Sequence, residues 1–128
     1  MQLDIVIPCF NEEEVLKEIH LRLKKILEEL KGKKLIDIYN IIFVDDGSND
    51  GTFEVIENFS QKDKSVKALS LSRNFGHQAA LSAGLKFSKG DAVISLDADL
   101  QDPPELIETM LKRFHDGFEI VYGVRDDR

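Results

Sequence analysis

The sequence contains one cysteine, no tryptophan and no long run of apolar residues. Because Cys9 is alone, the chain cannot form an internal disulfide, and this fits a reducing compartment. No apolar stretch approaches the roughly 18 residues that a membrane-spanning helix needs. The start of the chain also lacks the basic segment and the apolar segment of a secretory signal peptide. These absences lead us to expect that the chain itself is cytoplasmic.

Positive charge is also scarce, since 17 lysine and arginine residues face 24 aspartate and glutamate residues, for a net charge of −7. A protein that binds DNA or RNA nonspecifically needs a basic face, so we expect no nucleic-acid partner. A nucleotide diphosphate is not excluded in this way, because a bound metal ion reverses the local sign of the charge. The length, with 42% hydrophobic and 32% charged residues, fits a single globular domain over residues 1–128.

Short apolar runs alternate with longer segments of helical period. In the first of these segments Val15, Ile19, Leu23, Ile26 and Leu30 share one helical face. Strands are predicted at residues 3–7, 39–44, 66–70, 92–96 and 120–122, and helices at about 12–30, 52–61, 77–87 and from 102 onward. This alternation predicts an α/β fold with a mainly parallel, doubly wound sheet.

Two acidic pairs follow the ends of predicted strands. Asp97 and Asp99 come directly after the fourth strand, and Asp45 and Asp46 come after the second. Because ligands of open parallel sheets bind outside the carboxyl ends of the strands, we expect these carboxylates to lie close together. A divalent cation would relieve their repulsion, with the carbonyl oxygen of Gln101 as a further ligand, and a nucleotide diphosphate would complete the site. The alternative is a set of solvated acidic turns.

The segment between the first strand and the first helix is a third candidate. Phe10 can stack on a nucleobase, and Glu12 can accept a hydrogen bond from a sugar hydroxyl. The alternative is structural, with a hydrophobic staple and a helix start at Asn11. Cys9 is predicted to be a small core residue in either case.

The sequence assigns no definite role in the site to two arginines and two histidines. Arg73 lies before the third helix and Arg125 after the fifth strand, where each can contact a pyrophosphate or form a surface ion pair. His77 begins a helix beside the predicted site, but nothing in the sequence makes it a base. His20 is predicted to lie at the surface.

Other nucleotide and phosphate sites fit the sequence poorly. The chain has neither a Gly-x-Gly-x-x-Gly motif nor a P-loop, which excludes the usual dinucleotide and P-loop sites. A phospho-acceptor signalling domain also gathers acidic residues around Mg²⁺ on a parallel sheet. Its acidic pair follows the first strand, however, and it needs a lysine where this chain has Arg125. That alternative is therefore disfavoured.

Four segments are more specific together than any one of them alone. In chain order they are IVIPCFNEE at 5–13, VDDGSNDGT at 44–52, SRNFGH at 72–77 and LDADLQDPP at 96–104. With these segments the chain resembles the GT-A glycosyltransferases of family 2. Among them it is most similar to the polyprenyl-phosphate glycosyltransferases, such as dolichyl-phosphate mannose synthase and its bacterial undecaprenyl-phosphate relatives. The resemblance covers essentially the whole chain.

The resemblance implies a role for each candidate residue. The residues implied to contact the nucleoside are Pro8, Phe10, Glu12, Asp45 and Asp46. Those implied at the ribose, the metal ion and the diphosphate are Asp97, Ala98, Asp99 and Gln101, with Arg125 at the donor phosphates. The implied ligands of the metal ion, Mg²⁺ or Mn²⁺, are Asp97, Asp99 and Gln101. Phe10 stands where tyrosine is commoner, which keeps the stacking and loses only a hydroxyl.

The implied reaction is transfer of a hexose from UDP-hexose or GDP-hexose to a dolichyl or undecaprenyl phosphate, with inversion at the anomeric carbon. Family members are longer, so we expect residues 1–128 to be the donor-binding part of a chain truncated on its carboxyl-terminal side. The acceptor-binding half, any general base and the membrane-associated helices would lie elsewhere in the parent, at the cytoplasmic face of a membrane. Alternatives are a family 2 enzyme that builds a surface polysaccharide and a noncatalytic nucleotide-binding fragment.

Overall fold

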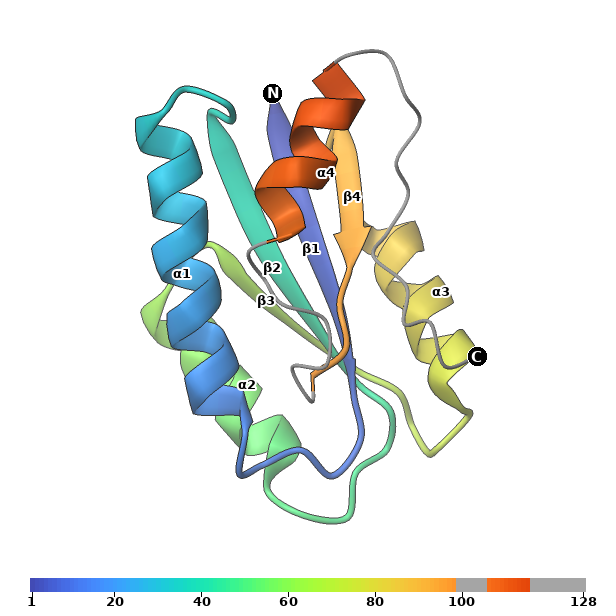
Figure 1. Ribbon diagram of the computed structural model, residues 1–128. Helices are drawn as coiled ribbons and strands as arrows, with labels where there is room; N and C mark the ends of the chain where they lie inside the picture. The colour runs from blue at the N-terminus through green and yellow to red at the C-terminus, as the bar shows by residue number, and fades with distance from the viewer. Residues whose placement is uncertain (99–105, 116–128) are drawn as a thin grey trace.

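The computed structural model, shown in Figure 1, describes residues 1–98 and 106–115. Strands and helices alternate along the chain, which confirms the predicted α/β class. The elements are β1 (Gln2–Cys9), α1 (Leu16–Gly32), β2 (Ile38–Asp45), α2 (Thr52–Lys62), β3 (Val66–Ser70), α3 (His77–Phe87), β4 (Ala92–Ser95) and α4 (Leu106–His115). The fifth strand predicted at 120–122 and the helix start predicted at 102 lie outside the described residues.

The four strands form one parallel sheet with the order β3-β2-β1-β4. Ile5 of β1 is paired with Ile41 of β2 on one side and with Ile94 of β4 on the other. From β1 the chain therefore builds the sheet first toward β3 and then returns to add β4 on the opposite edge of β1. The order of the strands reverses between β1 and β4, and ligands of doubly wound sheets bind at such a switch point.

Helices cover both faces of the sheet, as Figure 1 shows. Apolar residues of α1, α2 and α4 pack on one face, in a core that includes Leu3, Ile5 and Ile7 of β1. On the other face α3 packs on Val6 together with residues of β2. Strand β1 is thus buried on both faces, which explains its nearly continuous apolar sequence. Among the described residues, no helix has the length and apolar character needed to cross a membrane.

Helix α1 begins later than the sequence predicts. It starts at Leu16 rather than near Glu12, because Asn11 adopts a positive φ of 54° and the backbone N–H of Glu12 bonds to the Thr52 side chain. The buried face of α1 is also shifted relative to the prediction, with Leu27 buried in place of Ile26. Tertiary hydrogen bonds therefore decide where this helix begins, against the local helical pattern.

Helix α3 lies very close to the sheet, as its small residues predict. A Cβ atom added at Gly84 would lie 2.4 Å from Cγ1 of Val6 and 3.1 Å from Cγ2 of Val44. Ala80, one turn earlier on the same helix, is fully buried. The absence of a side chain at Gly84 is therefore what allows this separation between helix and sheet.

A polar cluster joins α1 to the turn between α2 and β3. Asp63 accepts hydrogen bonds from the backbone and hydroxyl of Ser65, and the Nζ of Lys24 lies 3.0 Å from its carboxylate. Burial alone would raise the pKa of Asp63, but these bonds outweigh it and lower the pKa from 3.8 to about 2. His20 was predicted at the surface, and this is wrong: its ring stacks on Phe59 with centroids 4.3 Å apart. Burial lowers the pKa of His20, which favours the neutral ring.

We expect Asp63→Asn to destabilise the fold at neutral pH and to have little effect in strong acid. The carboxylate has a depressed folded-state pKa, so its stabilisation is present above pH 3.8 and is lost as the pH falls toward about 2. The full depression would correspond to about 2 kcal/mol in the free energy of unfolding, and solvent screening of this partly exposed carboxylate makes the expected effect smaller, about 1 kcal/mol. Urea unfolding at pH 7 and at pH 2.5, where about a third of the stabilisation should remain, measures this. Equal destabilisation at the two pH values would contradict the explanation.

Gly84→Ala is expected to destabilise the protein by about 1–3 kcal/mol, because the added methyl group overlaps Val6 in a packed core. The matched control is Gly32→Ala at the end of α1, where an added Cβ meets no atom within 4 Å. Helix propensity alone favours alanine at both positions. Denaturant unfolding of the two variants therefore separates packing from propensity, and equal stabilisation by both would show that the contact with Val6 relaxes at no cost.

Candidate functional site

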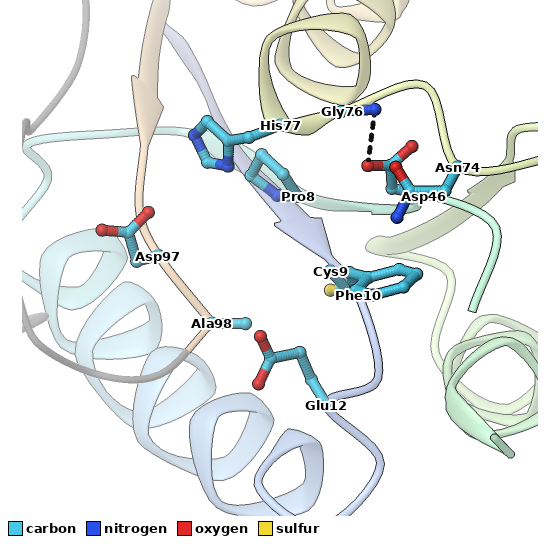
Figure 2. A pocket seen from close by; sticks show the side chains of 10 residues that line it. All are labelled: Pro8, Cys9, Phe10, Glu12, Asp46, Asn74, Gly76, His77, Asp97 and Ala98. Carbon is cyan, nitrogen blue, oxygen red and sulfur yellow. Dashed lines mark hydrogen bonds between the residues drawn. The ribbon is translucent and has the colours of Figure 1, made fainter. Parts of the chain in front are cut away.

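A pocket of about 320 Å³ opens at the carboxyl ends of β1 and β4, at the switch point of the sheet (Figure 2). Its residues come from the end of β1, from the loops that follow β1, β2, β3 and β4, and from the start of α3. They are Pro8, Cys9, Phe10, Glu12, Asp46, Asn74, Gly76, His77, Asp97 and Ala98. Four segments that are far apart in the sequence thus meet where the topology predicts a ligand.

Most of the described candidate residues come together in this pocket. The predicted residues that line it are Pro8, Phe10, Glu12, Asp46, Asp97 and Ala98. Asp45 instead lines a neighbouring pocket of about 670 Å³, which shares Phe10 and Asn74 with the first one. Three further predicted residues, Asp99, Gln101 and Arg125, lie outside the described residues, and their placement stays a prediction.

Hydrogen bonds fasten the loop after β1 to the loop after β2. The N–H of Asn11 donates to Oγ of Ser48 at 2.8 Å, and the N–H of Asn49 donates to Oδ1 of Asn11 at 2.9 Å. In the same way, Glu12 donates its N–H to Oγ1 of Thr52 at 2.9 Å. A fourth bond runs from the N–H of Gly51 to a Glu13 carboxylate oxygen at 3.0 Å. We call this set of four bonds the loop clasp.

Each bond of the loop clasp joins a side chain to a backbone N–H, so it depends on residue type. The structural alternative for this segment, a helix start at Asn11, is wrong, because Asn11 uses its side chain to hold the neighbouring loop and α1 begins at Leu16. The clasp leaves the Phe10 side chain partly exposed, at 38%, where it borders both pockets. A flat aromatic ring held in that position is available for stacking.

The two carboxylates after β2 have different partners, although each residue is only 4% exposed. Asp45 accepts a hydrogen bond from Ser48 within its own turn, at 3.3 Å. Asp46 accepts bonds from two N–H groups of the loop after β3, that of Phe75 at 2.9 Å and that of Gly76 at 3.1 Å. Asp46 therefore connects two of the loops that line the pocket.

The loop after β3 contributes residues to which the sequence analysis assigned no role. Asn74 and His77 line the pocket together with Gly76. The predicted position of His77 beside the site is confirmed. The position of Asn74 was detectable in principle, because the loop after β3 leaves the same edge of the sheet as the acidic pairs. Arg73 does not reach this pocket; its guanidinium lies 4.7 Å from the ring centroid of Phe75 and lines the neighbouring pocket.

Cys9 is the small core residue that the sequence predicts. It is 2% exposed, and its thiol lies 3.4 Å from the carbonyl oxygen of Ile7. Burial, with the nearby charges of Glu12 and Asp45, raises the pKa of this thiol well above its usual range. The thiol is therefore neutral at physiological pH and is poorly suited to act as a nucleophile.

One predicted ligand of the metal ion lines the pocket. Within residues 1–98 and 106–115 no group of three or more His, Cys, Asp and Glu side chains is arranged to hold an ion. Of the predicted ligands, this part of the chain includes only Asp97, which lies just past β4 and lines the pocket (Figure 2). Its carboxylate oxygens are the donor type that Mg²⁺ and Mn²⁺ prefer.

The model of the family "Glycosyl transferase family 2" matches residues 4–128. The chain belongs to glycosyltransferase family 2. The four segments that carry the resemblance all lie within the matched residues, and three of them supply the loops after β1, β2 and β3.

Curated glycosyltransferases are similar to the whole chain. An uncharacterized glycosyltransferase of Bacillus subtilis strain 168, YkoT, is 49% identical over 98% of this chain and 38% of its own length. The bactoprenol glucosyl transferase of Shigella phage SfX is 40% identical over 100% of this chain and 40% of its own length. The chain therefore spans about two fifths of the length of these relatives.

A solved glycosyltransferase shares the fold. The mannosyltransferase PcManGT of Pyrobaculum calidifontis, in complex with GDP-Man and Mn²⁺, superimposes with a TM-score of 0.60 and 22% identity. The match covers 79% of this chain and 32% of that one. The expected GT-A architecture is thus confirmed at the level of the fold.

We expect Thr52→Val to destabilise the protein by about 1–3 kcal/mol, because it removes the acceptor of the Glu12 N–H from a fully buried position. The control Thr52→Ser keeps the hydroxyl and loses only a methyl group. Denaturant unfolding and the amide exchange rate of Glu12 report on stability and on the loop clasp. If the valine and serine variants exchange at the same rate, the clasp does not hold this loop.

Proposed function

We propose that this chain is the donor-binding part of an inverting glycosyltransferase that moves a hexose from a nucleotide-diphosphate sugar to a polyprenyl phosphate. The observation that carries the proposal is the pocket at the switch point, where Asp97 meets Phe10 and Asp46 in a chain of family 2. The similarity to bactoprenol glucosyl transferases over the whole chain supports a polyprenyl phosphate acceptor.

The pocket supplies the contacts that a nucleotide needs. The proposed nucleoside contacts are Pro8, Phe10, Glu12 and Asp45, with Asp46 beside them in the pocket, and those at the ribose and diphosphate are Asp97, Ala98 and Arg125. Phe10 offers an exposed ring for stacking at the border of the two pockets. Carboxylates around the pocket accept hydrogen bonds from base N–H groups and sugar hydroxyls, which gives orientation as well as affinity.

A divalent cation, Mg²⁺ or Mn²⁺, fits the donors proposed for it, since Asp97, Asp99 and Gln101 all offer oxygen atoms. When bound, such an ion would act as a Lewis acid that neutralises the charge of the leaving diphosphate. The complex of PcManGT with GDP-Man and Mn²⁺ supports metal use on this fold. In a chain of net charge −7, the ion would also make the pocket acceptable to a diphosphate.

A phosphate acceptor requires no catalytic base in this part of the protein. A phosphate acceptor is already anionic, so its attack on the anomeric carbon requires no deprotonation by a base. Any base, the acceptor-binding surface and the contact with the cytoplasmic face of a membrane would then belong to other parts of a longer protein. Because the chain spans about two fifths of its relatives, we propose that residues 1–128 bind the donor but turn over slowly.

Calorimetric titration tests donor binding. UDP and GDP, each with and without Mn²⁺, are titrated into the wild-type chain and into Asp97→Asn. We expect one nucleotide to bind in the presence of Mn²⁺, and Asp97→Asn to weaken this binding by about tenfold or more, because a charged ligand of the metal is lost. The preferred base would then narrow the choice of sugar donor.

The matched control is Glu57→Gln, which removes an exposed carboxylate from α2 outside the pocket and should leave binding unchanged. Failure of the wild type to bind either nucleotide with Mn²⁺ would refute donor binding by this chain. Binding that ignores both the metal and Asp97→Asn would refute the metal site alone. Fast hexose transfer by residues 1–128 would overturn the proposal that these residues bind the donor but turn over slowly.

A further inference from the structure

We propose that Asp46 is a positioning residue that acts on the nucleotide through the loop after β3, by holding the backbone of Phe75 and Gly76 against the end of β2. This inference rests on the proposed function for its consequence but on the hydrogen bonds of the structure for its mechanism. It assigns to Asp46 a different role from that of Asp45, although the two neighbours are equally buried.

Both carboxylate oxygens of Asp46 are engaged by the loop. Oδ1 accepts the N–H of Phe75 at 2.9 Å, and Oδ2 accepts the N–H of Gly76 at 3.1 Å, as Figure 2 shows for the latter. Asp46 is held in turn by its own N–H, which donates to the carbonyl oxygen of Cys9 at 2.8 Å. Asp46 therefore links the end of β2 to a loop 30 residues further along the chain.

The backbone conformation of the loop makes this hold necessary. Gly76 has φ 104° and ψ 160°, a region open essentially only to glycine, and it directly precedes α3. Phe75 is half exposed, so packing of its side chain does not fix the loop. Among the described residues, no hydrogen bond is found for the N–H of Arg73 or of Asn74. The two bonds to Asp46 are thus the local restraint at the turn into α3.

The loops after β2 and β3 also make a close backbone contact at Gly47. A Cβ atom at Gly47, the next residue after Asp46, would lie 2.3 Å from the backbone of both Arg73 and Asn74. The carboxylate and the close approach at Gly47 therefore act on neighbouring points of one loop. Together they place Asn74 and His77 at the wall of the pocket that faces Asp97.

A second buried carboxylate holds a backbone turn in the same way, at the amino end of β1. Asp4 is 1% exposed, and one of its oxygens accepts the N–H groups of Lys89 and Gly90 at 3.0 and 2.9 Å. Those residues form the turn between α3 and β4, which lies outside the pocket. Helix α3 is thus anchored to the sheet by one aspartate before its first turn and by another after its last turn.

Amide hydrogen exchange of the nucleotide-free chain tests directly whether Asp46 holds the loop after β3. After correction for intrinsic rates, the N–H groups of Phe75 and Gly76 should exchange about tenfold or more slowly than those of Arg73 and Asn74, since bonds to a carboxylate are stronger than average. Asp46→Asn replaces one acceptor oxygen by a donor and should remove most of this protection. The control Asp45→Asn should leave the protection of Phe75 and Gly76 intact.

Nucleotide binding then separates positioning from direct contact. Gly76→Ala leaves the Asp46 carboxylate in place but strains the loop, and its added Cβ meets no atom within 4 Å. If Asp46 acts through the loop, Asp46→Asn and Gly76→Ala should both raise the Kd for the nucleotide and Mn²⁺ by about tenfold. The wild-type comparison of the four amides needs no variant and stands even if a variant fails to fold.

Equal exchange at all four amides of the wild type would overturn the proposal. So would an Asp46→Asn variant that loses nucleotide binding while Phe75 and Gly76 stay protected, or a Gly76→Ala variant that binds as the wild type does. Protected amides in a wild-type chain that binds no nucleotide would instead refute the proposed function and leave the loop contact in place.

Discussion

Hydrogen bonds from side chains of one loop to the backbone of the next are the constraint on which this site depends. The sheet brings four loops to one edge, but loops at a surface have few apolar contacts to order them. Asn11, Thr52 and Asp46 supply that order by accepting N–H groups of loops other than their own. Each such bond contributes about 1 kcal/mol net, whereas its loss at a buried site costs about 1–3 kcal/mol. The shape of the pocket is therefore sensitive to a few polar residues.

The position of the site follows from the topology rather than from any one motif. Strand β1 lies between β2 and β4 and is buried on both faces, so neighbouring elements hold its carboxyl end in place. The chain reaches β2 through α1 on one face of the sheet and β4 through α3 on the other face, and the pocket opens where the order of the strands reverses. Asp97 lies in that space because β4 ends two residues before it.

The sequence predicts the architecture well because periodicity and turn residues are local signals. The bounds of β3 and α3 are those predicted, and the acidic residues after β2 and β4 do lie at one edge of the sheet. The errors arise where a distant partner overrides the local pattern. Asn11 prefers the loop clasp to a helix cap, and His20 prefers the ring of Phe59 to solvent. The bond from the Gly76 N–H to the Asp46 carboxylate joins residues 30 positions apart and has no periodic signature in the sequence.

The loop clasp also bears on how such a site can diversify. Surface loops usually tolerate insertions and deletions, and a binding site commonly changes its specificity by changing loop length. Here the register between the loops after β1 and β2 is set by four side-chain bonds, and a residue inserted within 11–13 or 48–52 would separate donors from their acceptors. Descendants of this chain would therefore acquire new ligand preferences by exchanging side chains on loops of constant length, such as Phe10, while the lengths themselves are inherited unchanged.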